Sequence, residues 1–108
     1  KVVSPKGGED MSRKYELIYI LSPTLDEETN SALHERIQTL ITRSEGTVDS
    51  VDHWGRKRLA YEIEDQTEGD YCVVLFTAAP EVPREIESQL EITNGVMRYM
   101  IVAVTEEN

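Results

Sequence analysis

Four segments of the chain have the hydrophobic pattern of β-strands. YELIYIL at residues 15–21 and YCVVLFTAA at residues 71–79 are almost continuously apolar, which is typical of strands buried on both faces of a sheet. Residues 47–64 are extended in pattern but more polar, and VMRYMIVAV at residues 96–104 forms the last apolar segment. The sequence therefore predicts two central strands and two that lie nearer the edges.

Two further segments repeat apolar residues at helical spacing, over residues 26–44 and 83–92. Thr24 or Asp26 can cap the first helix, and Gly46 can supply a left-handed stop. The two apolar stripes consist of Leu33, Ile37, Leu40 and Ile41 in the first helix, and of Val82, Ile86 and Leu90 in the second.

The long extended segment contains a glycine, Gly55, which predicts a bulge or a bend. After it, Leu59, Tyr61 and Ile63 share one face by alternation, and we expect that face to contact the core. The polar stretch EDQTEGD at residues 64–70 predicts a hairpin turn.

The order of these elements is βαββαβ, the ferredoxin-like arrangement of the α+β class. Right-handed crossovers give a four-stranded antiparallel sheet of order 4-1-3-2, with two helices on one face and the other face open. The 108 residues suffice for one small domain. We place it at residues 13–104, with residues 1–12 as a disordered extension, compatible with a non-native start before Met11, and residues 105–108 as a tail.

The amino-acid composition excludes or disfavours several classes of function. With 21 acidic and 11 basic residues the formal net charge is −10, which disfavours a non-specific binder of polyanions. No segment reaches the ~18 apolar residues of a membrane span, so we expect no membrane partner. The lone Cys72 suits a reducing, cytoplasmic compartment. No phosphate loop, GxSxG, CxxC or acid–base carboxylate pair is evident, so we expect neither an enzyme nor a bound cofactor.

Charge is unevenly distributed along the chain. The helices are rich in glutamate and aspartate, whereas six of the eleven basic residues lie at or in strands, which predicts an acidic helical layer and a basic sheet side able to hold phosphates. Because the first and last strands start at opposite ends of the sheet, these residues cannot form one compact patch. The six are Arg13, Lys14, Arg56, Lys57, Arg58 and Arg98.

The basic run lies within HWGRKRLAY at residues 53–61. Alternation would place Trp54, Arg56 and Arg58 on the open face, where arginine forks and an aromatic ring suit RNA with unpaired nucleotides. A bulge at Gly55 would turn Trp54 to the other face and leave the arginines in place. The competing reading is an edge strand that carries cations to prevent aggregation, and the sequence leaves the two open.

The remaining candidates have simpler readings. Neither His34 nor His53 has a second histidine, a cysteine or a paired carboxylate at ligand spacing, so packing or surface roles are favoured over a metal site. Cys72 fits a small buried hydrophobe. Tyr99 joins Trp54 as a candidate for stacking on a base or a partner.

Four stretches together resemble the bacterial small-subunit (30S) ribosomal protein six family: YELIYILSP, WGRKRLAYEI, GDY and VMRYMIV. The resemblance covers about residues 13–104 and is most specific in the GRKRLAYEI run. It implies a ferredoxin-like structural protein of the ribosome that binds the central domain of the small-subunit ribosomal RNA together with small-subunit protein eighteen, and is a monomer when free. Many relatives have proline where this chain has Glu62, which places an acid near the basic run.

A second class of function competes with this one. A small regulatory or ligand-binding module of the same fold would act as a homodimer through its sheet face. An acylphosphatase-like enzyme is less favoured, because the sequence contains no anion-binding loop.

Overall fold

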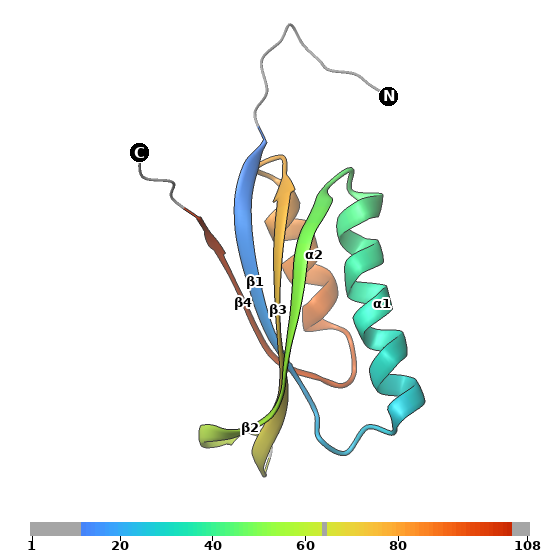
Figure 1. The fold of residues 1–108 in the computed structure, drawn as a ribbon, viewed down its shortest axis with the longest axis vertical. Helices are drawn as coiled ribbons and strands as arrows, with labels where there is room; N and C mark the ends of the chain where they lie inside the picture. Colours follow the sequence, from blue (N-terminus) through green and yellow to red (C-terminus); the bar gives the residue numbers. More distant parts are fainter. Residues whose placement is uncertain (1–11, 64, 105–108) are drawn as a thin grey trace, which may run out of the picture.

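The computed structural model describes residues 12–63 and 65–104 of the chain. Six elements follow one another in the order βαββαβ (Figure 1). They are β1 (Arg13–Leu21), α1 (Glu27–Arg43), β2 (Thr47–Ile63), β3 (Gln66–Ala78), α2 (Val82–Glu91) and β4 (Val96–Ala103). The extension and the tail expected from the sequence lie outside the described residues, apart from Ser12.

The strands form one antiparallel sheet in the order β2-β3-β1-β4, which confirms the predicted 4-1-3-2 topology. Both helices cover the same face, and residues 12–63 and 65–104 place no helix on the opposite face (Figure 1). Among the described residues, no helix is both long and apolar enough to cross a membrane.

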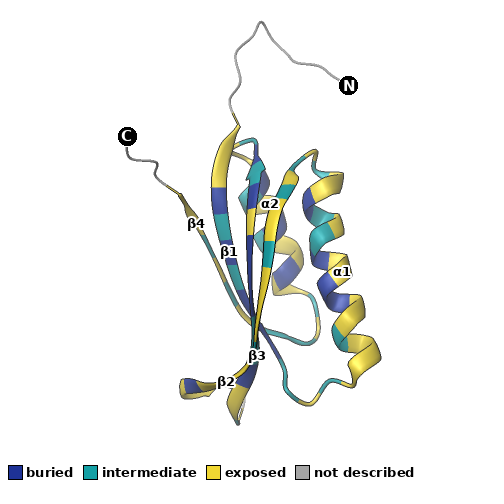
Figure 2. Ribbon diagram, viewed as in Figure 1, coloured by how far each residue is buried: buried dark blue, intermediate teal, exposed yellow. Residues whose placement is uncertain are grey.

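The core lies between the sheet and the two helices. Leu17 and Tyr19 of β1 and Val74 and Phe76 of β3 are fully buried there, because β1 and β3 are the central strands. The helices contribute their predicted stripes to the same core, apart from the partly exposed Leu40. Figure 2 shows burial concentrated on the central strands and on the inward sides of the helices.

The first helix begins as predicted but ends differently. The side chain of Asp26 accepts a hydrogen bond of 2.7 Å from the backbone N–H of Thr29. The left-handed residue after the helix is Glu45, with φ 66°, so the prediction that Gly46 supplies this conformation is wrong. Gly46 is needed for space instead: a Cβ atom there would lie 3.0 Å from the carbonyl oxygen of Ile41.

The connection between β2 and β3 is much tighter than the predicted turn at residues 64–70. Pairing continues to Ile63 and Gln66, so most of that polar stretch belongs to β3. The prediction was wrong because the far end of the β2–β3 hairpin projects past the helices (Figure 1), where strand residues are polar because they face water. We call this projecting part, residues 55–63 and 66–70, the basic ribbon.

Candidate nucleic-acid and partner interface

The basic ribbon begins at a bulge. The pairing of β2 with β3 shifts between His53 and Gly55, and Gly55 has a left-handed φ of 83°. Trp54 is therefore the extra residue, and its ring stacks on Tyr71 with centroids 6.3 Å apart and planes 12° from parallel. Trp54 Nε1 donates a hydrogen bond of 3.1 Å to the carboxylate of Asp52. Since Tyr71 pairs with Ile20 on the side away from the helices, Trp54 lies on the open face.

The arginines lie on the opposite side of the ribbon from Trp54. Arg56 pairs with Asp70 and donates a hydrogen bond of 3.0 Å to the carbonyl oxygen of Pro23, in the loop before α1. Asp70 itself accepts a hydrogen bond of 2.8 Å from Asn30 of α1, which places this pair on the helix side. Arg58, two residues further along, points the same way.

The prediction that both arginines share the open face with Trp54 is therefore wrong. It assumed that Leu59 and its neighbours face the helices, whereas Leu59 is buried on the open side, beside Gly69. A Cβ atom at Gly69 would clash with Ile20, so this glycine allows the ribbon to curl onto the open face. The bulge at Gly55 changes the phase of alternation along β2, so Trp54 and the arginines lie on opposite faces.

A second cationic group gathers on the open side of the ribbon. Lys57 Nζ lies 5.8 Å from the centre of the Trp54 ring, and the Arg98 guanidinium lies 5.3 Å from the centre of the Tyr61 ring. No local pattern predicts the second contact, because Tyr61 and Arg98 meet only through the folding of β2 across the sheet. Arg98 and Lys57 thus occupy the same end of the open face.

Arg13 and Lys14 lie at the opposite end, where β1 pairs with Ala78 and Thr77. The expected separation from Arg98, which pairs with Ile20, is confirmed. Both residues are exposed.

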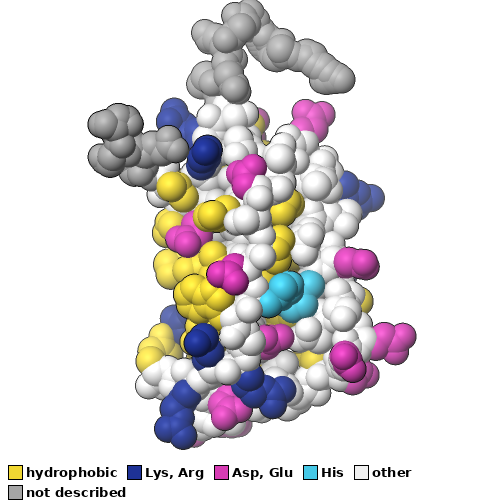
Figure 3. Space-filling view, in the orientation of Figure 1, with side chains coloured by type: hydrophobic (Ala, Val, Ile, Leu, Met, Phe, Trp, Pro, Cys, Tyr) yellow, Lys and Arg dark blue, Asp and Glu magenta, His cyan; other side chains and the backbone are white. Residues whose placement is uncertain are grey.

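Between these two ends the open face is apolar rather than basic. Leu75, Met100 and Val102 are 38%, 53% and 41% exposed, respectively, and Figure 3 shows such side chains gathered between the Lys and Arg side chains. Acidic side chains also lie on the face shown in Figure 3, so the open side of the sheet is less basic than the prediction of a basic sheet side implied. Tyr99, a predicted stacking residue, instead packs against the helix-side core. Tyr61 is the more exposed tyrosine, at 60%.

Charges across the ribbon are paired by register. Arg56 stands opposite Asp70, and Arg58 stands opposite Glu68. Opposite charges on neighbouring strands stabilise the pairing modestly and lower the net charge that a phosphate meets. The ribbon therefore has no net charge, because Arg56, Lys57 and Arg58 are balanced by Glu62, Glu68 and Asp70, and its cations can attract a phosphate only locally.

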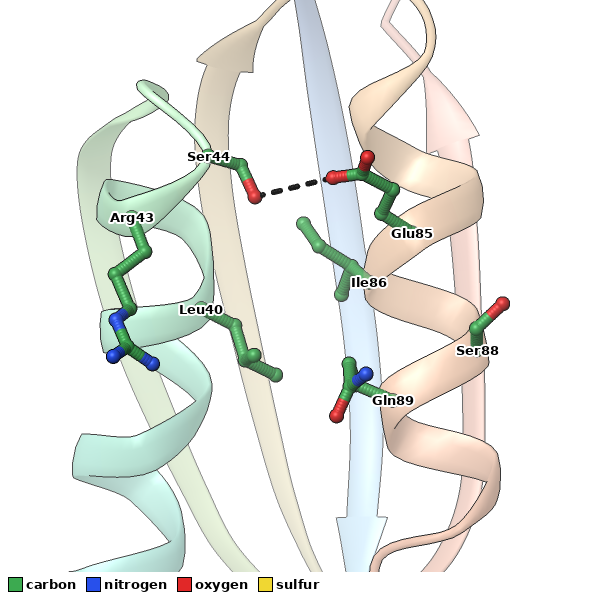
Figure 4. Close-up of a pocket in the computed structure, with 7 residues that line it drawn as sticks. All are labelled: Leu40, Arg43, Ser44, Glu85, Ile86, Ser88 and Gln89. Atoms are coloured by element: carbon green, nitrogen blue, oxygen red, sulfur yellow. Dashed lines mark hydrogen bonds between the residues drawn. The ribbon is translucent and has the colours of Figure 1, made fainter.

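The groove between the two helices offers a weaker site for a phosphate than the sheet does (Figure 4). Leu40, Arg43 and Ser44 line it from the α1 side and Glu85 lines it from α2, and the hydroxyl of Ser44 lies 3.5 Å from the Glu85 carboxylate. One arginine and one glutamate leave no net charge to attract a phosphate. The groove also lies on the helix layer, away from the open face of the sheet.

Two histidines and the cysteine meet at the junction of α1, β2 and β3. His53 pairs with Cys72, with Nδ1 3.7 Å from Sγ, and the rings of His34 and His53 are 4.6 Å apart and perpendicular. The sequence favoured packing or surface roles for both histidines because it shows no ligand spacing, whereas the fold brings them next to each other and to Cys72. Consecutive members of the group are 19 residues apart in the sequence, a spacing that matches no metal-binding motif, so only the tertiary structure reveals the group.

The interior part of this group is neutral. Burial, together with nearby His53, lowers the pKa of His34, and burial raises the pKa of the Cys72 thiol. Burial also raises the pKa of Tyr19, whose hydroxyl lies 2.6 Å from His34 Nδ1. A neutral imidazole and a tyrosine hydroxyl can thus share a hydrogen bond inside the core.

Comparison with known proteins places this arrangement in a family. The family described as Ribosomal protein S6 matches residues 14–103. The chain is 51% identical to small ribosomal subunit protein bS6 of Clostridium beijerinckii and 48% identical to that of Clostridium novyi. Each match extends over 90 residues, which are 83% of this chain and 95% of the relative.

Solved structures agree with the sequence comparison. The crystal structure of 30S ribosomal protein S6 from Thermotoga maritima superposes with a TM-score of 0.82 at 31% identity, covering 86% of this chain and 88% of that one. The C-terminal domain of the MgtC protein from Mycobacterium tuberculosis, at 11% identity and a TM-score of 0.61, shares the fold alone; the alignment covers 91% of this chain and 94% of that one. The chain belongs to the ribosomal protein S6 family.

Proposed function

We propose that this chain is a structural constituent of the small ribosomal subunit that binds the central domain of the small-subunit ribosomal RNA together with small-subunit protein eighteen. Membership of the S6 family supports the ribosomal role, and the basic ribbon is the observation that carries the RNA contact. We expect the protein to act within the ribosome, in the cytoplasm, by binding rather than by catalysis.

The ribbon suits RNA because it presents cations on both of its sides. Arg56 and Arg58 project on one side, and Lys57 projects on the other, close to Trp54. Arginine binds phosphate oxygens in a fixed fork, and lysine adds a point charge. Each neutralised phosphate releases counterions, so such contacts make binding depend on salt.

The apolar centre of the open face suits a protein. Leu75, Met100 and Val102 would gain nothing from a phosphate backbone, whereas an apolar partner surface would remove them from water. Trp54, 47% exposed and stacked on Tyr71, stands where this apolar surface meets the cations of the ribbon. We assign it to the boundary between the protein partner and the RNA.

The two contacts should depend on each other. A chain of net charge −10 repels RNA at long range, and the ribbon arginines already face carboxylates across the strand. A partner that covers the open face and binds the same RNA would supply the missing attraction, which makes binding cooperative. Tight, salt-insensitive binding of the isolated protein to this RNA would contradict the proposal.

A homodimeric regulatory module is the second candidate, because an exposed apolar sheet face also suits self-association. Sedimentation distinguishes the two. The ribosomal role predicts a free monomer that comigrates with small-subunit particles, whereas the regulatory role predicts a stable dimer that does not.

Footprinting of the central-domain RNA tests the assignment. We expect protein and partner together to protect nucleotides that neither protects alone, and we expect Arg56→Ala with Arg58→Ala to remove part of that protection. Arg36→Ala with Arg43→Ala, on the helix, is the matched control and should leave it intact. Unchanged protection in the ribbon variant would overturn the ribbon contact.

A further inference from the structure

The group formed by His34, His53 and Cys72 lies at the base of the basic ribbon, directly before the bulge at Gly55. Each residue offers one metal-ligand atom, and the three atoms lie within 4.8 Å of one another. Among the described residues, no other three histidine, cysteine or carboxylate side chains bring their ligand atoms together in this way.

The chemistry of the three ligand atoms narrows the choice of metal ion. Two imidazole nitrogens and one thiolate sulfur form a set that zinc prefers, whereas magnesium and calcium require oxygen. In a tetrahedral zinc site, bonds of about 2.0 Å to nitrogen and 2.3 Å to sulfur separate the two ligand atoms by about 3.6 Å. His53 Nδ1 and Cys72 Sγ are 3.7 Å apart, so this pair already has the required spacing.

The surroundings supply the second layer of a metal site. Tyr19 Oη lies 2.6 Å from His34 Nδ1, and the carboxylate of Asp70 lies 3.8 Å from His34 Nε2. A metal would replace one of these contacts, and the other would orient the ring, as hydroxyl and carboxylate neighbours do for metal-binding histidines. Asn30 fixes the Asp70 carboxylate in turn through a hydrogen bond of 2.8 Å.

Access and rigidity also fit. Cys72 is fully buried and His34 is 9% exposed, whereas His53 is exposed on the edge strand and opens the group to solvent. Water can therefore take a fourth position. The two inner ligands are held by the core, so little order is lost when an ion binds.

We propose that His34, His53 and Cys72 form a binding site for a zinc ion, which ties the edge strand β2 to β3 and α1 directly before the bulge at Gly55. The ion would fix the strand where the basic ribbon departs from the sheet. The inference rests on the geometry of this group and does not depend on the RNA-binding role.

Metal titration of the untagged full chain, with a reductant that contains no thiol, tests the site. We expect one zinc ion per chain by calorimetry, and with Co²⁺ the absorption band of thiolate-to-cobalt charge transfer. Zinc at a hundredfold excess over its Kd should raise the melting midpoint by ~10 °C. His53→Gln should weaken binding at least ~10-fold without unfolding the chain, because His53 is exposed.

Two further variants keep the test decisive. Cys72→Ala should abolish the charge-transfer band, and Glu35→Gln, an exposed carboxylate next to His34, should change nothing. Absence of the band in the folded wild-type chain would overturn the proposal. Zinc affinity that is equal in wild type, His53→Gln and Cys72→Ala would also overturn it, because the ion would then bind surface carboxylates.

Discussion

The helix-covered part of the sheet and the basic ribbon share strands β2 and β3 but are stabilised by different means. In the covered part, β3 buries Val74 and Phe76 completely under the helices. In the ribbon, strand pairing is supported by Leu59 against Gly69 and by opposed charges at positions such as Arg56 and Asp70. Stability therefore resides mainly in the first region, and the cations proposed to contact RNA reside in the second.

This difference explains how an acidic protein can present a cationic surface. A ribbon that contributes little to the core can carry charged side chains on both sides without burying any of them. The bulge at Gly55 and the missing side chain at Gly69 turn the ribbon relative to the sheet. Substitutions in the two regions should accordingly affect different measurements.

The largest loss of stability should follow from a cavity in the covered part. Leu17→Ala removes a fully buried side chain from β1, and we expect the free energy of unfolding to fall by about 3 kcal/mol. Chemical denaturation measures this. Met100→Ala, which is 53% exposed, is the control and should change it by less than about 0.5 kcal/mol. Equal losses in both variants would remove the distinction between the two faces.

A smaller loss should follow at the start of the ribbon. Gly55→Ala places a Cβ on a residue with φ 83°, and we expect a cost of about 1 to 2 kcal/mol, because no steric clash adds to the backbone strain. Gly55→Asn should cost less, since asparagine tolerates this conformation. If the two variants were equally stable, the left-handed bulge would not be what the ribbon requires.

The smallest effect should come from the helix cap. The N–H of Thr29 lowers the pKa of the Asp26 carboxyl below its ordinary value of 3.8. A carboxylate with a depressed pKa stabilises the folded state above the unfolded pKa, and this contribution is lost as the pH falls through the folded pKa. Asp26→Ala should therefore lower the melting midpoint at pH 7, and the difference from wild type should shrink below pH 4.

An unchanged difference between pH 7 and pH 3 would show that the charge of Asp26 is not what caps the helix. Glu27→Gln, a neighbouring exposed acid in the first turn, is the matched control. It tests whether an acidic side chain near the helix N-terminus is enough to stabilise the helix through the helix dipole, without the hydrogen bond that Asp26 accepts.

The sequence predicted the covered part well, because burial leaves a periodic pattern. The two apolar runs correctly marked β1 and β3 as central strands, and the helical stripe correctly chose the buried face of α1. The ribbon was predicted poorly for the same reason. Its polar residues resembled a turn, although they continue β3 from Gln66.

The candidate sites needed the tertiary structure. Alternation alone does not show on which face of the sheet Leu59 is buried. The prediction chose the helix face for Leu59 and therefore placed Arg56 and Arg58 on the wrong face. The contact of Arg98 with Tyr61 joins residues from two separate strands. His53 lies opposite Cys72 because of the register between β2 and β3, and no local sequence motif predicts that register.

The salt dependence of RNA binding, measured in the presence of small-subunit protein eighteen, tests the central claim most directly. If Arg56 and Arg58 each neutralise a phosphate, then replacing both with alanine should weaken binding and reduce the slope of log affinity against log salt by about 2. The unfolding free energy should stay within about 1 kcal/mol of wild type. An unchanged slope in a folded double variant would contradict the account.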